Sequence, residues 1–564
     1  MPGRPAPEMR EKAALPRRIC LPDFAGRAVS LPEEPQAWAV AGEGEYALLL
    51  GLGPGRARDL PFLRQRARVF WLDEPLTRRR LQALRPVAER ERLPANWQEI
   101  SPDQAVELAP RCTRFFYRPG LRLAPEFWGP LLGRLDAALL AAGEKSRIRP
   151  GVATAAGPDS ALAKDAHNCR GPVLLPGTDR QLLHQELRRA LTVCGFAPIW
   201  EALPPEPANA HNPAHGSGAS AQGGGQGAWE SLWAGRKPVL LLSVNLRGLD
   251  PDGRLFYFCR ALGVPVALWF VDNPWHLLSA LRQPWWREAA LFVTDAGFIP
   301  GLKAAGARRV FHLPLAVAPH MWRDVPEQDG EKAAGIGCGP PLFVGRSAFP
   351  ERERFFAAAR VPAALMAEAE ALLSQPHGAG PMPDVHWWLQ KLHVTPWPGH
   401  SVRCAGLGAE RCALVNRVRW LRAGASAGLR VVGDKGWQGL LPGLELLPPV
   451  DYYTVLPRLY AAAAAVLNVT SLLLPQSLSQ RHFDVWAAGG LLLSDPSPGL
   501  EIFPEELTRP MTLRGPEELL PRLAEFRAHP ARAHALRAAW RAHLLAGHGY
   551  EHRVARICEL LEIP

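Results

Sequence analysis

Short apolar runs alternate with mixed polar and apolar stretches through the middle of the chain. The runs contain almost no polar residue and are found at 239–244 (VLLLSV), 266–271 (VALWFV), 291–294 (LFVT) and 310–313 (VFHL). The stretches between them have helical lengths and are found at 252–262, 275–281 and 298–305. Continuously apolar strands are typical of parallel sheets, because helices cover both faces of such sheets. The alternation therefore predicts a doubly wound α/β domain with right-handed crossovers.

A similar alternation appears on both sides of this region. Toward the C-terminus, the runs of strand length lie at 341–344, 429–432, 444–447, 465–468 and 491–494. They are followed by a helical pattern at 517–561, and two further apolar runs lie near the N-terminus at 46–51 and 67–72. Single hydrophobic cores stop growing at about 250–300 residues. A chain of 564 residues must therefore contain several domains.

Composition marks the boundaries between these blocks. Residues 204–228 consist mainly of Pro, Gly, Ser, Ala and Asn and cannot bury a core. We therefore predict a Rossmann-like α/β N-terminal domain at 1–200, a flexible linker at 204–228, and doubly wound parallel-sheet domains at 229–325 and 340–564. A Trp- and His-rich insertion near 375–403 is expected to be buried core, with an acceptor-binding surface as the alternative.

The N-terminal block contains a glycine-rich turn. Gly51, Gly53 and Gly55 follow the first apolar run, and Asp73 lies further along, after the second run. A strand, a glycine turn and an acidic residue about 20 positions later form the layout of a mononucleotide-binding unit. Pro54 occupies the turn and the full GxGxxG pattern is absent, so a ligand-free turn is the alternative.

Composition and charge narrow the functional classes. Hydrophobic residues make up 47% and charged residues 21% of the chain, which are values of ordinary globular proteins, and the abundance of Pro, Gly, Ala and Arg is typical of a bacterial genome rich in G and C. The net charge of +11 comes without a nucleic-acid recognition motif, so no nucleic-acid partner is predicted. A basic surface instead suits anionic ligands or membrane headgroups. The nine cysteines lack metal-ligand spacing, and no apolar leader is recognisable, so a cytoplasmic protein with peripheral membrane contact is expected.

In the last block, small and charged residues follow the predicted strands. Gly345 and Arg346 come after the first strand, and Gly433, Asp434 and Lys435 come after the second. In doubly wound sheets, ligands bind outside the carboxyl ends of the strands, where the first turns of helices offer free N–H groups to anions. A glycine there lets the backbone approach a phosphate, and a cation neutralises it. These positions are therefore predicted to bind a phosphorylated ligand.

The segment 475–490 reads as a loop that leads into a helix. Ser477 and Ser479 are candidate caps of this helix, and Arg481 in its first turn would suit a diphosphate. Asp484 lies three residues on, on the same helix face, where it would accept hydrogen bonds from ribose hydroxyls. Asp495 stands at the end of the strand that follows.

These residues belong to a wider pattern. Residues 479–495 fit SxRxF(E/D)xxAxGGxLLxD, with Phe483 as its aromatic position, and the preceding strand ends in LNVT. Two further segments are His548-Gly-Tyr550-Glu-His552-Arg553 and LWFVDNP at 268–274. Together, over roughly residues 230–560, they resemble the spore-maturation (CgeB-type) glycosyltransferases. Asp484 departs from the usual Glu of that family, and Gly549 departs from its Thr.

The resemblance implies a GT-B-like pair of Rossmann-like domains, here preceded by the additional N-terminal domain. It implies a metal-independent, hexosyltransferase-like enzyme that uses a nucleotide-diphosphate sugar as co-substrate and no cofactor. Together with the residues that follow the strands, the motif gives the candidate donor-binding residues, which are Gly345, Arg346, Gly433, Asp434, Lys435, Ser477, Ser479, Arg481, Phe483, Asp484 and Asp495.

Three acidic residues in the middle block are ambiguous. Asp272 follows a strand and is a candidate base on the acceptor side, but it would equally serve as the N-cap of a helix that starts near Pro274. Asp250 and Asp252 form a DxD pattern that a metal could use, yet a capping turn before a helix is expected there.

The sequence therefore predicts a glycosyltransferase that transfers a sugar to a glycan, lipid-linked or protein acceptor, with cell-surface glycan precursors among the candidates. Two alternatives remain. One is a non-catalytic GT-B-like binding or assembly protein. The other is an enzyme that uses a nucleotide or S-adenosylmethionine bound by the N-terminal block.

Overall fold

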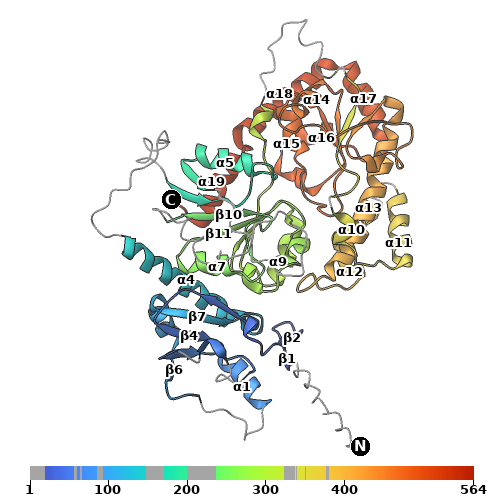
Figure 1. The fold of residues 1–564 in the computed structure, drawn as a ribbon. Coiled ribbons are helices and arrows are strands. Elements are labelled where there is room, and N and C mark those ends of the chain that lie inside the picture. Colours follow the sequence, from blue (N-terminus) through green and yellow to red (C-terminus); the bar gives the residue numbers. More distant parts are fainter. Residues whose placement is uncertain are drawn as a thin grey trace, which may run out of the picture. The chain divides into compact units, whose positions relative to one another are not determined.

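The computed structural model describes residues 19–55, 60–63, 66–84, 93–147, 170–199, 237–322, 337, 339–349, 351–375 and 380–564. The chain divides into two compact units, Met1–Gly151 and Val152–Pro564, and Figure 1 shows the helices and strands of each. The linker predicted at 204–228 lies outside the described residues.

The first unit is built on a five-stranded sheet. Its strands in spatial order are β3 (Trp38–Ala41), β7 (Cys112–Tyr117), β4 (Tyr46–Leu50), β5 (Val69–Leu72) and β6 (Trp97–Glu99). All neighbours are parallel except β3, which runs antiparallel to β7. The α-helices are α1 (Pro75–Ala83), α2 (Pro102–Leu108), α3 (Arg118–Leu123) and α4 (Pro125–Arg147), and β1 (Ile19–Pro22) pairs with β2 (Ala28–Leu31) outside the sheet.

The second unit begins with a six-stranded sheet that is parallel throughout. In spatial order its strands are β13 (Arg309–His312), β12 (Ala290–Val293), β11 (Val266–Phe270), β10 (Leu240–Val244), β8 (Gly171–Leu174) and β9 (Phe196–Ile199). Helices α5 (His184–Val193), α7 (Arg254–Ala261), α8 (Pro274–Leu278) and α9 (Ile299–Ala304) connect them. The four strands predicted in this region are confirmed.

The structure differs from the predicted boundary near residue 200. β8 and β9 lie in the same sheet as β10, since Val173 pairs with Leu240 and Gly171 with Phe196. The segment rich in Pro and Gly is therefore part of the connection between β9 and β10, within one sheet. A low capacity to bury surface marks a long crossover loop as well as an interdomain linker, so composition alone could not separate the two.

A second parallel sheet of five strands follows. In spatial order its strands are β16 (Glu445–Leu447), β15 (Arg430–Val432), β14 (Leu342–Val344), β17 (Val466–Asn468) and β18 (Leu492–Ser494). From β14 the chain adds β15 and β16 on one side, and it then adds β17 and β18 on the other side of β14. The order of strand addition therefore reverses between β14 and β17. That reversal is the topological switch point at which ligands bind in doubly wound folds. The two sheets of the second unit make the predicted GT-B-like pair of Rossmann-like domains.

In the second unit we call the six-stranded sheet the first sheet and the five-stranded sheet the second sheet. Helices connected to the second sheet also contact the first. The connection from β14 to β15 holds α10 (Arg352–Phe355), α11 (Ala363–Ser374), α12 (Val385–Lys391) and α13 (Val402–Ala423). The remaining ones are α14 (Leu456–Ala462), α15 (Arg481–Ala487), α16 (Glu505–Met511), α17 (Leu519–Ala528), α18 (Pro530–Gly547) and α19 (Tyr550–Leu561). In Figure 1, α19 returns to the first sheet, where it lies beside α5. Arg170 Nε donates to the carbonyl of Pro564 over 2.9 Å there.

The helices between β14 and β15 form a second bridge between the sheets. The ring centroids of His276 on α8 and Phe355 lie 5.2 Å apart, and those of Trp286 and Trp397 lie 5.5 Å apart. Trp397, like Trp387 and Trp388, is buried. The tryptophans of the insertion are therefore part of the core and not an exposed acceptor-binding surface.

Candidate functional site

Arg481, at the start of α15, lies at the switch point of the second sheet. Its Nη1 donates to the carbonyl of Val344 at the end of β14 over 2.6 Å, and its Nε donates to Asn468 Oδ1 at the end of β17 over 3.0 Å. Burial lowers the pKa of Arg481, yet a guanidinium remains charged in proteins. Nη2 is hydrogen-bonded to none of the described residues. A fixed cation with one free donor group thus stands in the crevice where ligands of such sheets bind.

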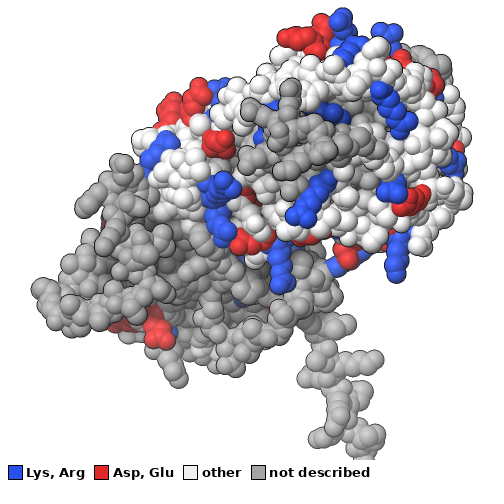
Figure 2. All heavy atoms as spheres, turned by 90° about the horizontal axis from the view of Figure 1, so that it is seen from above, with Lys and Arg blue, Asp and Glu red and all other residues white. Residues whose placement is uncertain are grey.

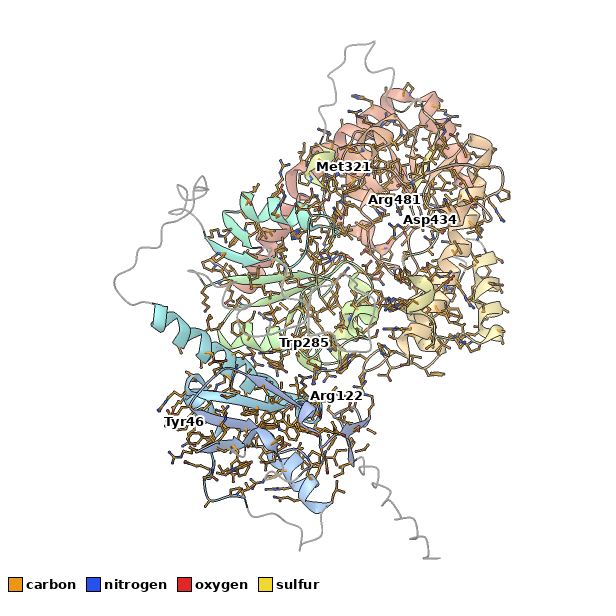
Figure 3. All side chains as sticks on the ribbon, viewed as in Figure 1. Tyr46, Arg122, Trp285, Met321, Asp434 and Arg481 are labelled. Carbon is orange, nitrogen blue, oxygen red and sulfur yellow. The ribbon has the colours of Figure 1, made fainter. Side chains whose placement is uncertain are left out.

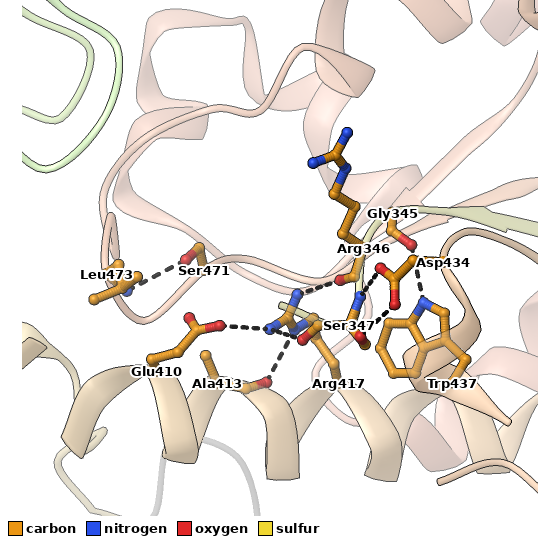
Figure 4. Close-up of polar contacts among 10 residues, drawn as sticks. All are labelled: Gly345, Arg346, Ser347, Glu410, Ala413, Arg417, Asp434, Trp437, Ser471 and Leu473. Atoms are coloured by element: carbon orange, nitrogen blue, oxygen red, sulfur yellow. Dashed lines mark hydrogen bonds and ion pairs between the residues drawn. The ribbon is translucent and has the colours of Figure 1, made fainter. Parts of the chain in front are cut away.

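The loop after β14 is held from several sides (Figure 4). The carbonyl of Gly345 accepts a hydrogen bond from Trp437 Nε1 over 2.9 Å. The carbonyls of Arg346 and Ser347 accept from Arg417 Nη1 and Nη2 on α13, over 2.8 and 3.2 Å. The side chain of Arg346 points away from these contacts and is exposed. The backbone of this loop is therefore fixed while its cation faces solvent.

The loop after β15 lies against the loop after β14. A Cβ atom at Gly433 would stand 2.3 Å from the carbonyl oxygen of Gly345, so a glycine is required for this approach. Asp434 accepts hydrogen bonds from the N–H and Oγ of Ser347 over 2.8 and 2.6 Å. Desolvation raises the pKa of Asp434, but these hydrogen bonds outweigh it and lower the pKa below its ordinary value. Asp434 therefore ties the two loops together as a carboxylate.

Three cations consequently stand at successive strand ends. Lys435 follows Asp434 and is exposed, as Arg346 is, while Arg481 lies deeper between β14 and β17. Figure 3 labels Arg481 and Asp434 within the second sheet's half of the unit. Guanidinium and ammonium groups on neighbouring segments at one edge of a sheet are suited to an anion with several oxygens, such as a diphosphate.

Asp484 is enclosed rather than open to a ligand. It is 1% exposed and accepts hydrogen bonds from Ala318 N (3.1 Å), Gln480 Nε2 (2.9 Å) and the Tyr452 hydroxyl (2.7 Å). Burial raises its pKa to about 7, against the lowering effect of these donors. The carboxyl thus fastens α15 to the segment that follows the first sheet. In this arrangement a ribose hydroxyl cannot reach it, in contrast to the contact that the sequence predicted.

Other predicted donor residues are also internal. Phe483 is fully buried, with its ring 5.8 Å from Phe503, and belongs to the core. Asp495 is 3% exposed and accepts from the N–H and hydroxyl of Thr470, so it links the loops after β17 and β18. Burial raises the pKa of Asp495 to about 6.

The two serines do not cap α15. Its N-cap residue is Gln480, and no side chain caps the helix. Ser479 Oγ donates instead to Asn468 Oδ1 over 2.8 Å, and Ser477 is buried with its hydroxyl against the carbonyl of Leu478. The predicted capping role is wrong because the chain enters the helix through a residue that is already in helical conformation.

On the first sheet, Asp272 follows β11 but does not cap α8. The cap is Asn273, whose Oδ1 accepts from the N–H of Trp275 over 3.0 Å. Asp272 is exposed, and its Oδ2 accepts from Asn245 Nδ2 over 2.7 Å. The surrounding protein desolvates the carboxyl enough to raise its pKa, although Asn245 and Arg247 act in the opposite direction. A helix-capping role for Asp272 is thereby excluded.

Asp272 also lies at the seam between the two sheets. The neighbouring Asn273 donates from Nδ2 to the carbonyl of Leu473 over 3.2 Å. Asp295, after β12, accepts from the N–H of Gln476 over 2.9 Å. The loop that joins β17 to α15 therefore rests on the carboxyl ends of β11 and β12, close to the candidate base.

The DxD pattern is a capping turn. Asp250 accepts hydrogen bonds from the N–H groups of Asp252, Arg254 and Leu255 over 2.9 to 3.1 Å. Within the described ranges, no group of three or more His, Cys, Asp or Glu residues is arranged to hold a metal ion.

Two polar groups near the site could not be predicted from the sequence. Glu186 on α5 is 3% exposed, shares a side-chain hydrogen bond with Tyr453, and has an Oε2 atom with no hydrogen-bond partner in the described chain. Arg417 pairs with the buried Glu410 over 3.6 Å. Arginines are scattered through many helices of this chain, so nothing in the pattern distinguishes Arg417 from the others.

In the first unit, side chains of the same unit pack on the glycine turn. A Cβ atom at Gly53 would lie 2.7 Å from the indole of Trp38, and one at Gly51 would lie 2.9 Å from Tyr117 Cβ. Asp73 accepts from the N–H of Leu52 over 3.1 Å and so holds the turn itself. This packing favours the ligand-free interpretation of the turn.

The charges on the described surface and the hydropathy of the described helices do not point to a particular partner. On the face shown in Figure 2, basic and acidic side chains are interspersed over the coloured part of the molecule. None of the described helices combines the length and the apolar character that a membrane crossing requires.

Comparison with known proteins gives one sequence match. Residues 411–559 match the model of a protein family described as glycosyl transferase-like. No curated protein matches the sequence.

Several solved structures match at low identity. T4 phage β-glucosyltransferase is 8% identical with a TM-score of 0.34, covering 69% of this chain and 99% of its own. An α-glucosyltransferase in complex with UDP and a 13-mer DNA is 11% identical with a TM-score of 0.36, covering 70% and 98%. The α,α-trehalose 6-phosphate synthase of Burkholderia multivorans is 10% identical with a TM-score of 0.31, covering 57% and 70%. The segment 411–559, which contains Lys435 and Arg481, is thus similar in sequence to glycosyl transferase-like proteins.

Proposed function

We propose that this protein is a glycosyltransferase whose second sheet binds a nucleotide-diphosphate sugar and whose first sheet binds the acceptor. The observation that carries the proposal is the position of Arg481, which bridges the ends of β14 and β17 at the switch point. Arg346 and Lys435 extend its positive charge along the neighbouring strand ends. The match of 411–559 to glycosyl transferase-like proteins supports the same activity.

The chemistry requires stabilisation of a departing diphosphate. When the bond between the anomeric carbon and the phosphate oxygen breaks, negative charge develops on that oxygen. Preorganised cations aimed at this charge lower the barrier, which is the electrostatic contribution that metal ions supply in other enzymes. Arg481, Arg346 and Lys435 would supply it here, so we propose transfer without a metal ion or other cofactor.

The acceptor is proposed to be a hydroxyl of a glycan, a lipid-linked glycan or a protein. Its oxygen would attack the anomeric carbon while its proton passes to the carboxylate of Asp272. Asp272 is exposed and lies beside the loop that leads to α15, which suits this role. The narrower hypothesis, a cytoplasmic bacterial enzyme of the CgeB-type family acting on cell-surface glycan precursors, rests on the motif resemblance at 479–495.

Thermal unfolding with UDP-, GDP- and TDP-sugars tests donor binding, and release of the free sugar tests turnover. We expect one nucleotide sugar to raise the Tm and to be hydrolysed slowly. Arg346→Ala and Lys435→Ala should each weaken its binding by roughly 10-fold, because each removes one charge-assisted contact from an exposed position. Arg481→Ala should weaken binding further.

Arg458→Ala is the matched control, because Arg458 is exposed on α14 of the same sheet. A nucleotide sugar that raises the Tm without hydrolysis or transfer would indicate the non-catalytic binding protein instead. If no nucleotide sugar raises the Tm while NAD or S-adenosylmethionine does, the proposal is wrong and the first unit carries the function.

A further inference from the structure

The turn after β10 has an unusual backbone. Asn245 and Leu246 both adopt positive φ angles, of 54° and 64°. Non-glycine residues in this left-handed region cost of the order of 1 kcal/mol or more each, and a leucine tolerates it less well than an asparagine. Two in succession persist only where the surrounding contacts enforce them, and such residues cluster at functional sites.

The contacts of Asn245 show what this backbone achieves. Its Oδ1 accepts hydrogen bonds from the N–H groups of Val271 (3.0 Å) and Asp272 (3.4 Å). Its Nδ2 donates to Asp272 Oδ2 over 2.7 Å, and its own N–H donates to the carbonyl of Trp269. One amide side chain thus fixes both the backbone and the carboxylate of Asp272.

The following residues hold Asn245 in place. The backbone carbonyl of Arg247 accepts a hydrogen bond from Ser243 Oγ over 2.8 Å. The guanidinium of Arg247 donates from Nη1 to the carbonyl of Leu182 over 2.7 Å. Arg247 is also the charged group that acts on Asp272, where its positive charge favours the carboxylate. The turn is therefore secured at both ends, to β10 and to the loop that precedes α5.

The arrangement leaves the two oxygens of Asp272 in different states. Oδ2 is bound by Asn245, whereas Oδ1 makes no hydrogen bond to a described residue, and Asp272 is exposed. A general base needs this combination, because one oxygen must be oriented while the other reaches the proton that it accepts. Arg247 and Asn245 are the groups that would stabilise its charged form.

We propose that Asn245 is a positioning residue that orients the carboxylate of Asp272 for proton transfer from the acceptor hydroxyl. This inference rests on the proposed glycosyltransferase function. In the transfer step, the hydroxyl oxygen bonds to the anomeric carbon, the bond to the diphosphate breaks, and the proton moves to Asp272 Oδ1. Asn245 keeps its hydrogen bond to Oδ2 throughout and takes no proton.

A merely structural role would make different predictions. If Asn245 only joins β10 to β11, its replacement would lower stability and leave the pH dependence of transfer unchanged. If it positions the base, Asn245→Ala should lower kcat about 10- to 100-fold with little change in KM for the donor. The acidic limb of the kcat/KM profile should also move to higher pH, since the carboxylate loses a stabilising donor. Asn245→Asp should move it further, because it adds a like charge.

Leu246→Gly is the matched control. It releases the strained backbone one residue away and keeps the amide of Asn245, so its pH profile should remain that of the wild type. Asp272→Asn should abolish the acidic limb. Nucleotide-sugar binding, measured by the Tm shift of each variant, should stay unchanged in all four, which separates loss of the base from loss of folding.

Two results would overturn the inference in distinguishable ways. A wild-type enzyme that transfers sugar, together with Asn245→Ala and Asn245→Asp variants that keep its kcat and pH profile, would refute the positioning role alone. A wild-type protein that transfers no sugar from any donor would refute the proposed function and this inference with it. If Asn245→Ala does not fold, the comparison of Asn245→Asp with Leu246→Gly decides.

Discussion

Replacing Gly433 by alanine should force apart the loops that follow β14 and β15. The added Cβ would stand 2.3 Å from the carbonyl oxygen of Gly345 and 2.7 Å from Trp437 Nε1. Ordinary contacts of a Cβ begin near 3.4 Å, so the loops must separate by roughly 1 Å. The same movement weakens the hydrogen bond from Trp437 Nε1 to Gly345 that now measures 2.9 Å. Overpacking of this kind costs about 1–3 kcal/mol.

The assay compares Gly433→Ala with Gly439→Ala, which lies in the same loop region and whose added Cβ would meet no atom within 4 Å. Gly433→Ala should lower the Tm by several degrees and reduce the Tm shift given by a nucleotide sugar, because Arg346 moves with its loop. Gly439→Ala should be neutral or slightly stabilising, since it lowers only the entropy of the unfolded chain. Equal Tm values for the two variants would refute the close approach of the loops.

Three further predictions concern other contacts. Folding raises the pKa of Asp484 from 3.8 to about 7, so the contribution of this carboxyl to stability is greatest below pH 4 and is lost as the pH rises to 7. The Tm of Asp484→Asn minus that of the wild type should therefore increase when the pH is raised from 5 to 8. A decrease in this difference would contradict the prediction. Arg417→Ala should destabilise the protein by about 1–3 kcal/mol and weaken nucleotide binding, because two loop carbonyls lose their donor; Arg411→Ala, at an exposed position of the same helix, should do neither. Neither NAD nor S-adenosylmethionine should raise the Tm, since Trp38 and Tyr117 pack on the glycine turn; a clear shift with either would show that this turn opens to ligands.

The sequence predicted the strands of the second unit well, because runs such as 266–271 and 491–494 are apolar on both faces. It also placed Gly345, Gly433 and Lys435 directly after strands and Arg481 in the first turn of a helix, where chain order alone determines position. Both successes come from local patterns that tertiary packing does not override.

The errors concern orientation. Arg481 and Asp484 are three residues apart, and the sequence predicted that both would face the donor. The structure turns Asp484 toward Ala318, a residue 166 positions earlier in the chain, and buries Phe483 against Phe503. Helical spacing shows which side chains share a face but not which distant segment covers that face. The boundary near 200 failed for a related reason, because a composition typical of linkers also occurs within a crossover.

The return of α19 to the first sheet has a consequence for synthesis. β8 and α5 leave the ribosome early, whereas α19, which packs against α5, emerges several hundred residues later. At about 5–20 residues per second, this delay is roughly 20 to 70 seconds. During that time the residues of α5 that contact α19 in the folded protein lack their final cover. The nascent chain therefore exposes a hydrophobic surface that chaperones would bind, and a shortened chain without 550–563 should aggregate rather than yield a folded first sheet.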